Sequence, residues 1–321
     1  MRGSWAGKRV LVTGGSGFLG QPLCRLLERA RPAALLSPRR ADFDLTQPDA
    51  VEKLFVEAEP DVVFHLAARV GGIGANMAQP ADLYLSNLLM GTYVIEEARR
   101  AGVPKTVVVG TICSYPAMAP VPFRESSLWE GYPDPTNAAY GVAKKALLVQ
   151  AQSNRVQYGQ NVIYLMPTNL YGPGDKFHPA VSHVIPALIR RFVDAREQAL
   201  DGVEVWGSGK ATREFLFVDD AAEALVMAAE RYDGAEPVNL GSGSEIAIAD
   251  LAPLIASLVG YTGEVVWDRE RPDGQARRLL DTSAAAAAFG WRATTDLQDG
   301  LERTISWYQR NRLEAEAVTA L

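Results

Sequence analysis

The chain has 321 residues, which is long enough for one large domain or two unequal ones. Its hydrophobic content of 48% is ordinary for a globular protein, and its net charge of −6 argues against nucleic-acid binding through bulk electrostatics. No apolar run approaches the length that crosses a bilayer, so we expect no membrane partner. Two cysteines are too few for a disulfide framework or a zinc cluster, so we expect no metal site and a cytoplasmic location.

The N-terminal segment predicts a dinucleotide-binding turn. An apolar run at 8–13 is typical of a buried strand, and a helical pattern begins at Gln21. Glycines spaced as G-x-x-G-x-x-G between them permit a tight turn and close approach of backbone N–H groups to a diphosphate. A glycine motif alone also fits a flexible turn, but its place between strand and helix favours a dinucleotide. The residues of this motif expected at the cofactor are Gly14, Gly17, Phe18, Leu19 and Gly20.

The next predicted strand, residues 33–36, ends in a basic loop that affects the choice of dinucleotide. An NAD site usually has an acidic residue here, which binds the ribose 2′-hydroxyl. This chain has Arg39 and Arg40, which suit the 2′-phosphate of NADP(H), although a solvated loop would also accept two arginines and NAD(H) stays open. Asp44 and Leu45 follow, and we expect both near the adenine.

Alternating strands and helices up to about residue 170 predict the fold class. Such alternation predicts an α/β, doubly wound parallel sheet of the Rossmann type, with ligands at the carboxyl ends of the strands. Ala67 and Ala68 follow one strand, and Thr111 and Cys113 follow another, so we expect these residues at that edge. The expected strands are 61–68, 105–109 and 161–165, and the expected helices are about 81–101 and 139–157.

Tyr140 and Lys144 predict a proton-transfer site. Their i, i+4 spacing places both side chains on one face of a helix. A free tyrosine has a pKa of about 10, and a nearby ammonium favours the phenolate, so we expect Lys144 to lower the pKa of Tyr140. Such a group exchanges a proton with a sugar or alcohol oxygen, and Thr111 offers a second hydroxyl. The spacing also occurs on surface helices, so the dinucleotide motif upstream gives it its weight.

Beyond residue 170 the loops lengthen and the elements shorten, which predicts a smaller α/β substrate portion interleaved with the first. The expected division is a mainly NADP-binding Rossmann domain over 1–170, rejoined by about 213–240, and a mainly substrate-binding domain over 171–321. The expected helices are 182–199, 221–230, 248–259 and 296–310, and the expected strands are 203–206 and 213–218.

These motifs together resemble the extended short-chain dehydrogenase/reductase family over essentially the whole chain. The glycine turn and the Tyr140/Lys144 pair indicate only the superfamily, whereas the segments around Cys113 and His183 resemble members that act on GDP-4-keto-6-deoxy sugars. The resembling segments are 69–76, 111–116, 166–173, 177–186, 205–209, 213–216, 267–268, 272–274 and 279–281.

The resemblance implies NADPH-dependent 3,5-epimerisation and 4-reduction of a GDP-4-keto-6-deoxy sugar, with Cys113 as the base and His183 as the acid. A ketone at C4 acidifies the protons on C3 and C5, and thiol and imidazole groups both exchange protons near neutral pH. Tyr140 and Thr111 would stabilise the enolate oxygen, after which Tyr140 protonates C4–O⁻ while Lys144 holds the tyrosine and the nicotinamide ribose.

The resemblance also assigns ligand contacts and a homodimer. The homodimer would form through the helices near 81–101 and 139–157. Arginine forks suit a diphosphate, and Trp206 would form an apolar wall. The implied cofactor contacts are Pro167, Asn169 and Leu170, and the implied substrate contacts are Asn169, His183, Arg191, Trp206, Arg213 and Arg278.

Several alternatives stay open at this point. Related family members usually carry a pair of serines where Thr111 and Ile112 stand, and an arginine where Ser16 stands, so this chain suits other GDP-sugars, such as a 6-deoxyheptose. A GDP-sugar 3,5-epimerase or related nucleotide-sugar epimerase without net redox is the main alternative. A non-catalytic dinucleotide-binding protein is less favoured, because such proteins often lose the Tyr/Lys pair.

The chain has three histidines, and their roles are not equally open. His65 lies in an apolar strand and is expected to be a satisfied core residue. The acid is either His178 or His183, and the resemblance favours His183.

Overall fold

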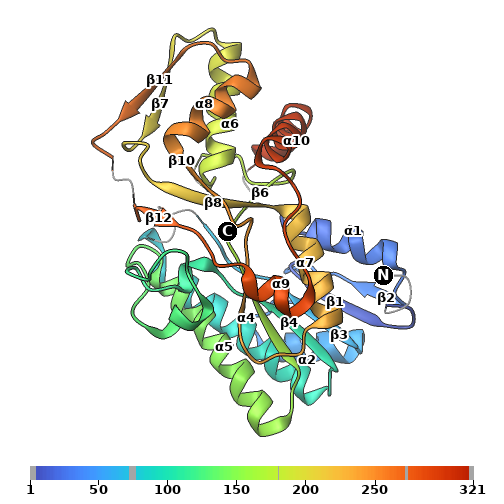
Figure 1. Cartoon of the computed structure of the whole chain (residues 1–321). Helices are drawn as coiled ribbons and strands as arrows, with labels where there is room; N and C mark the ends of the chain where they lie inside the picture. Colours follow the sequence, from blue (N-terminus) through green and yellow to red (C-terminus); the bar gives the residue numbers. More distant parts are fainter. Residues whose placement is uncertain (1–4, 72–76, 180, 272–273, 318–321) are drawn as a thin grey trace.

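The centre of the computed structural model is a six-stranded parallel sheet (Figure 1). The structure describes residues 5–71, 77–179, 181–271 and 274–317. The strand that follows β1 in the chain lies on one side of it, and the later strands are added on the other side. The switch point, where such sheets bind ligands, is therefore at the carboxyl end of β1. The strands in spatial order are β2 (Ala34–Leu36), β1 (Arg9–Thr13), β3 (Val62–His65), β4 (Lys105–Val109), β5 (Val162–Pro167) and β9 (Val238–Leu240). The predicted fold class is confirmed.

Helices cover both faces of this sheet because successive side chains of a strand point to opposite faces. Val10 and Val12 of β1 pack in one core cluster with Leu23 of α1, whereas Leu11 packs in another with Leu54 and Val94. The first face carries α1 (Gly20–Ala30), α7 (Val218–Arg231) and α9 (Ser283–Phe289). The second carries α2 (Pro48–Ala58), α4 (Pro80–Arg100) and α5 (Ala138–Tyr158).

A second core lies at the other end of the molecule, at the top of Figure 1. Its helices are α6 (Val184–Glu197), α8 (Ile248–Val259), α10 (Leu297–Arg310) and the short α11 (Arg312–Ala315). Its strands are β7 (Gly202–Trp206) paired with β11 (Glu264–Asp268), and β8 (Thr212–Phe217) paired with β6 (Asn169–Tyr171), β10 (Glu245–Ala247) and β12 (Arg277–Arg278). The 3₁₀ turns η1 (Ile112–Ser114) and η2 (Glu125–Trp129) precede α5. The expected division of the chain near residue 170 stays a prediction.

Several elements differ from those expected. The strand predicted over 61–68 ends at His65, so Ala67 and Ala68 lie in the segment after β3. Five strands, β6, β9, β10, β11 and β12, and the helices α2 and α11 were not predicted. Four of these strands have only two or three residues, which is too short to show an alternating pattern. Within the described residues, no helix combines the length and the apolar character that a membrane crossing requires.

Candidate active site

The glycine turn after β1 is built closely against the neighbouring strand end. Gly14 has a positive φ of 76°, and a Cβ on it would lie 2.7 Å from the backbone nitrogen of Ala67. A Cβ on Gly20 would lie 2.2 Å from the carbonyl oxygen of Gly14. Gly17 is exposed, and α1 begins without a side-chain cap, so no capping side chain covers the positive end of its dipole, although the Gln21 N–H donates to the Gly17 carbonyl at 3.0 Å. The turn therefore fits a dinucleotide diphosphate.

The basic loop after β2 is exposed at Arg39 and Arg40. Arg40 pairs with Asp44 at 3.7 Å, and the Asp44 carboxylate accepts hydrogen bonds from the backbone nitrogen and the hydroxyl of Thr46. These bonds, the backbone bond first, lower the pKa of Asp44. Leu45 is buried in the core beside α2. The loop thus presents two exposed guanidinium groups, of which Arg40 shares its charge with Asp44, and Asp44 is also held by its own turn.

The turn after β4 brings Thr111 and Cys113 against the first turn of α5. The Thr111 hydroxyl accepts a hydrogen bond from the backbone nitrogen of Cys113 at 3.1 Å, and Ser114 Oγ donates to the Gly141 carbonyl at 3.0 Å. A Cβ on Gly141 would lie 2.4 Å from the Cys113 carbonyl oxygen, so only glycine permits this approach. Cys113 is a free thiol of intermediate exposure. This packing explains how Tyr140, one residue earlier on α5, comes beside Cys113.

Lys144 is almost fully buried below Tyr140, with 2% of its surface exposed. Its ammonium donates to the Val109 carbonyl at 3.0 Å, and burial lowers its pKa to about 8. The expected lowering of the Tyr140 pKa is wrong for this structure: burial, and then the nearby Cys113, raise it. The reason is that removing a phenolate from water costs more than the lysine, bound to a carbonyl, returns. Tyr140 is therefore held in its protonated form, as an acid.

The three histidines occupy different settings. His65 is fully buried and pairs with the Thr13 hydroxyl at 2.8 Å, and burial, with the charge of Lys144 second, lowers its pKa to about 3. Its Nε2 has no hydrogen-bond partner, so the expectation of a fully satisfied core residue is only half right. His183 is the N-cap residue of α6, and the protein packed around its imidazole, with the charge of Lys176 second, lowers its pKa. The choice between His178 and His183 stays a prediction.

The predicted substrate residues fall into two groups. The Arg191 guanidinium lies 5.5 Å from the centre of the exposed Trp206 ring, and Arg271, which sequence reasoning missed, lies 4.9 Å from the same centre. Arg213 and Arg278 are register partners on β8 and β12. Arg271 comes near Trp206 because β11 pairs with β7, and no spacing in the sequence signals that pairing.

The carboxylate of Asp134 lies within range of the charges of Arg213 and Arg278. Asp134 accepts hydrogen bonds from the hydroxyl and the backbone nitrogen of Thr136, which lower its pKa most, and the charges of Arg278 and Arg213 lower it further.

The remaining predicted cofactor residues lie at the ends of β5 and β6. Pro167 ends β5, and the Asn169 side chain donates to the Glu214 carbonyl at 2.9 Å. Leu170 packs against the core beneath the sheet. Whether these residues touch the cofactor stays a prediction. Parts of three resembling segments, residues 72–76, 180 and 272–273, lie outside the described residues.

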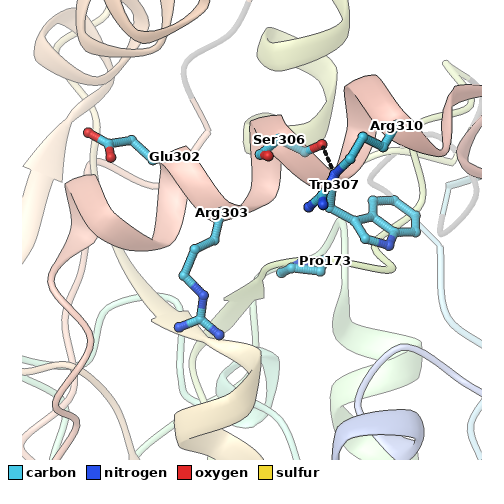
Figure 2. A pocket seen from close by; sticks show the side chains of 6 residues that line it. All are labelled: Pro173, Glu302, Arg303, Ser306, Trp307 and Arg310. Carbon is cyan, nitrogen blue, oxygen red and sulfur yellow. Dashed lines mark hydrogen bonds between the residues drawn. The ribbon is translucent and has the colours of Figure 1, made fainter.

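A surface cavity of about 470 Å³ lies away from this site, between α10 and the loop after β6 (Figure 2). Arg303, Trp307 and Arg310 extend from α10, and Arg310 donates to the Ser306 carbonyl. None of the predicted catalytic residues lines it. We therefore place the candidate active site by its chemical groups at the strand ends and not by this cavity.

Comparisons with known proteins agree with this geometry. Residues 10–241 match the NAD dependent epimerase/dehydratase family. The chain is 44% identical over 303 residues to GDP-L-fucose synthase 1 of Arabidopsis thaliana, which covers 94% of each chain. It resembles the crystal structure of a GDP-6-OMe-4-keto-L-xylo-heptose reductase from C. jejuni, with a TM-score of 0.88, 29% identity, and coverage of 95% and 98%. It also resembles an NADP-bound GDP-L-fucose synthetase from Naegleria fowleri, with a TM-score of 0.86, 28% identity, and coverage of 96% of each chain.

Proposed function

Because this chain belongs to the NAD dependent epimerase/dehydratase family of extended short-chain dehydrogenases/reductases, we propose that it is an NADP-dependent epimerase/reductase of a GDP-4-keto-6-deoxy sugar. The favoured reaction converts GDP-4-keto-6-deoxy-D-mannose to GDP-L-fucose. The observation that carries this proposal is the packing of a free thiol, Cys113, against Tyr140 at the carboxyl end of β4, with Lys144 directly beneath. A plain reductase needs the last two groups, whereas epimerisation also needs a base.

The cofactor assignment rests on the turn after β1 and the loop after β2. Gly14, Gly17 and the N-terminus of α1 would hold the diphosphate, and Arg39 with Arg40 would hold the 2′-phosphate. When bound, NADP(H) supplies the hydride for C4. Ser16 offers no positive charge, so the preference for NADP(H) over NAD(H) depends on the two arginines.

In epimerisation the residues act on protons next to the C4 ketone. Cys113 would remove the proton from C3 or C5, and His183 would return one on the opposite face of the ring. Hydroxyl groups of Tyr140 and Thr111 would donate to the enolate oxygen, which is charged in the transition state but not in the ketone. Thr111 is already oriented, because its Oγ accepts from the Cys113 backbone and leaves its proton for another acceptor.

In reduction Tyr140 would protonate the new C4 alkoxide. Its raised pKa keeps the proton in place until the alkoxide forms, since an alkoxide is a far stronger base than a phenolate. Lys144, fixed by its hydrogen bond to the Val109 carbonyl, would hold Tyr140 and the nicotinamide ribose. Arg213 and Arg278, adjacent on paired strands, would bind the GDP diphosphate, with Trp206 and Arg191 beside the nucleoside.

Incubation with GDP-4-keto-6-deoxy-D-mannose and NADPH in deuterated water tests this function. We expect stoichiometric NADPH consumption, deuterium at C3 and C5, and a product of the L-galacto configuration. Deuterium uptake without NADPH consumption would favour the 3,5-epimerase alternative. The absence of both deuterium uptake and NADPH consumption would favour a non-catalytic protein. Because the chain resembles the C. jejuni heptose reductase, a 4-keto heptose linked to GDP is a second substrate worth testing.

We also propose that two copies form a homodimer through α4 and α5. The two helices pack together, with Gln150 donating to the Thr92 carbonyl, and their outer faces expose Tyr84, Leu85 and Val149. Apolar side chains on adjacent 21-residue helices suit a four-helix interface with a second copy. Light scattering would measure the mass, and Leu85→Glu with Val149→Glu should yield monomers. The free state of Cys24 and Cys113 supports a cytoplasmic location.

A further inference from the structure

A tryptophan occupies an exposed position at the end of β7. Side chains alternate along this strand, so Val203 and Val205 are buried in the second core, whereas Trp206 exposes 56% of its surface. Two guanidinium groups lie near the indole, with Arg191 at 5.5 Å and Arg271 at 4.9 Å from the ring centre. An exposed aromatic ring beside cations is a suitable stacking surface for a flat ligand such as a nucleobase.

The two arginines beside this ring are held differently. Arg191 donates from Nη1 to the Glu204 carbonyl at 3.1 Å, which ties it to β7. The Arg271 side chain makes no hydrogen bond to the described residues, and its ion-pair partner among them is the Asp268 carboxylate, 3.4 Å from Nε. The other oxygen of that carboxylate accepts from the backbone nitrogen of Glu270 at 3.1 Å. Arg271 is therefore retained near the ring by charge, and its terminal nitrogens stay available to a ligand.

The segments that carry these residues continue to the two arginines proposed to bind the diphosphate. The pairing of β7 with β11 ends at Trp206, and farther along the same two segments Arg213 is the register partner of Arg278. A Cβ on Gly274 would lie 3.5 Å from the Arg213 guanidinium, so the connection from β11 to β12 passes close to that group. A nucleotide with its diphosphate at the two arginines can therefore extend its base toward Trp206 and Arg271.

We propose that Arg271 determines the nucleobase specificity of the enzyme by binding O6 and N7 of a guanine that stacks on Trp206. This inference rests on the proposed function, in which the substrate is a GDP-sugar. Guanine presents two acceptors on this edge, and a guanidinium, which only donates, matches both. Adenine has an amino group in place of O6, which would meet a donor with a donor. Because no hydrogen bond fixes the Arg271 side chain, it shifts from the indole to the edge of the stacked base.

The test is calorimetric titration of the full-length protein with GDP, inosine diphosphate, 7-deaza-GDP and ADP. The protein is first saturated with NADPH, so that ADP cannot occupy the dinucleotide site. Inosine diphosphate retains O6 and N7, 7-deaza-GDP lacks N7, and ADP lacks O6. We expect Arg271→Ala to weaken GDP and inosine diphosphate equally, by about tenfold, to weaken 7-deaza-GDP less, and to leave ADP nearly unchanged.

Arg269→Ala is the matched control for Arg271→Ala. Arg269 is an exposed arginine two residues earlier in the same connection, so its loss changes the net charge by the same amount. It should leave all four affinities near those of the wild type. With the GDP-sugar as substrate, Arg271→Ala should raise KM by about tenfold at nearly constant kcat, because the base lies far from C4 and is bound alike in the ground and transition states.

An equal loss of affinity for all four nucleotides in Arg271→Ala would overturn the inference, since it would show that the charge acts on the phosphates. An unchanged affinity for GDP would overturn it as well. The proposed function fails by a different observation. A protein that neither consumes NADPH nor takes up deuterium with the keto sugar would lose the proposed activity, while the nucleotide affinities would still decide the role of Arg271. A wild type that binds ADP as tightly as GDP would overturn both the inference and the assignment of a GDP-sugar.

Discussion

The ammonium of Lys144 donates a hydrogen bond to the backbone carbonyl of Val109 at 3.0 Å, in a position where only 2% of the lysine is exposed. This bond joins α5, which carries Tyr140, to the end of β4, which leads into Thr111 and Cys113. One buried cation thus connects the acid of the proposed reduction with the strand end that supplies the base. Its protonation state should therefore be visible in the pH dependence of the enzyme.

Reduction should lose rate as the pH rises through about 8, the value to which burial lowers the pKa of Lys144. The stability of the fold changes in the opposite direction. The pKa of Lys144 is higher in the unfolded chain, so the unfolded chain binds more protons above pH 8, and the folding free energy lost by burying the ammonium shrinks as the pH rises. Lys144→Arg keeps a charge at all these values and should remove this limb, at a lower maximum rate.

The pH profile of kcat for NADPH oxidation measures this effect. Lys145→Arg is the control, because Lys145 is on the same helix but donates to Leu128. If the alkaline limb persists in Lys144→Arg, another group is responsible for it.

Tyr140→Phe should slow reduction by about 10²- to 10⁴-fold, the contribution that a positioned acid usually makes. The fold should survive, because the ring is retained. Tyr164→Phe is a matched control: its hydroxyl donates to the Lys144 carbonyl, so its loss should reduce the free energy of unfolding by about 1 kcal/mol and leave reduction active. Single-turnover NADPH oxidation and thermal unfolding together separate the two. Wild-type turnover in Tyr140→Phe would exclude it as the acid.

Continuous apolar segments that end at a glycine were predictable from the sequence, whereas strands of two or three residues that depend on pairing were mostly not. The predicted bounds of β4 and α8 match the structure, because each is an apolar run that ends at Gly110 or Gly260. β12 has two residues and exists only because Arg277 and Arg278 pair with β8, which no local pattern indicates. Strand identity there depends on tertiary pairing.

The site shows the same limit. The spacing of Tyr140 and Lys144 predicted their shared helix face, but not the direction of the Tyr140 pKa, because burial is a property of the folded chain. Arg271 carried no motif, because its approach to Trp206 depends on the pairing of β11 with β7.

Trp206→Ala should raise KM for the GDP-sugar by about tenfold with little change in kcat, because an aromatic contact remote from C4 contributes on the order of 1 kcal/mol to both ground and transition states. Arg191 and Arg271 now flank the ring and would lose their partner as well. Trp206→Phe retains a ring and should stay near wild type. Initial-rate kinetics over a range of GDP-sugar concentrations tests this, and a fall in kcat at constant KM would place Trp206 nearer the reacting carbons than we propose.

Glu214→Gln should destabilise the protein and weaken substrate binding together. The Glu214 carboxylate is fully buried and accepts from the backbone nitrogens of Gly243 at 2.7 Å and Leu280 at 2.9 Å. A glutamine offers one oxygen, so its amide group would face a second N–H donor, at a cost of about 1–3 kcal/mol. Glu214 lies next to Arg213, and Leu280 lies two residues after Arg278, so the same change should disturb the spacing of both arginines.

Urea unfolding and KM for the GDP-sugar measure the two effects of Glu214→Gln. The same substitution at the exposed Glu302 on α10 provides the control and should change neither quantity. We expect KM to rise more than kcat falls, because the arginines would bind the diphosphate in substrate and transition state alike. A destabilised protein with an unchanged KM would show that the buried carboxylate supports the fold without setting the arginine spacing. An unchanged urea midpoint would show that the strand ends relax around the amide.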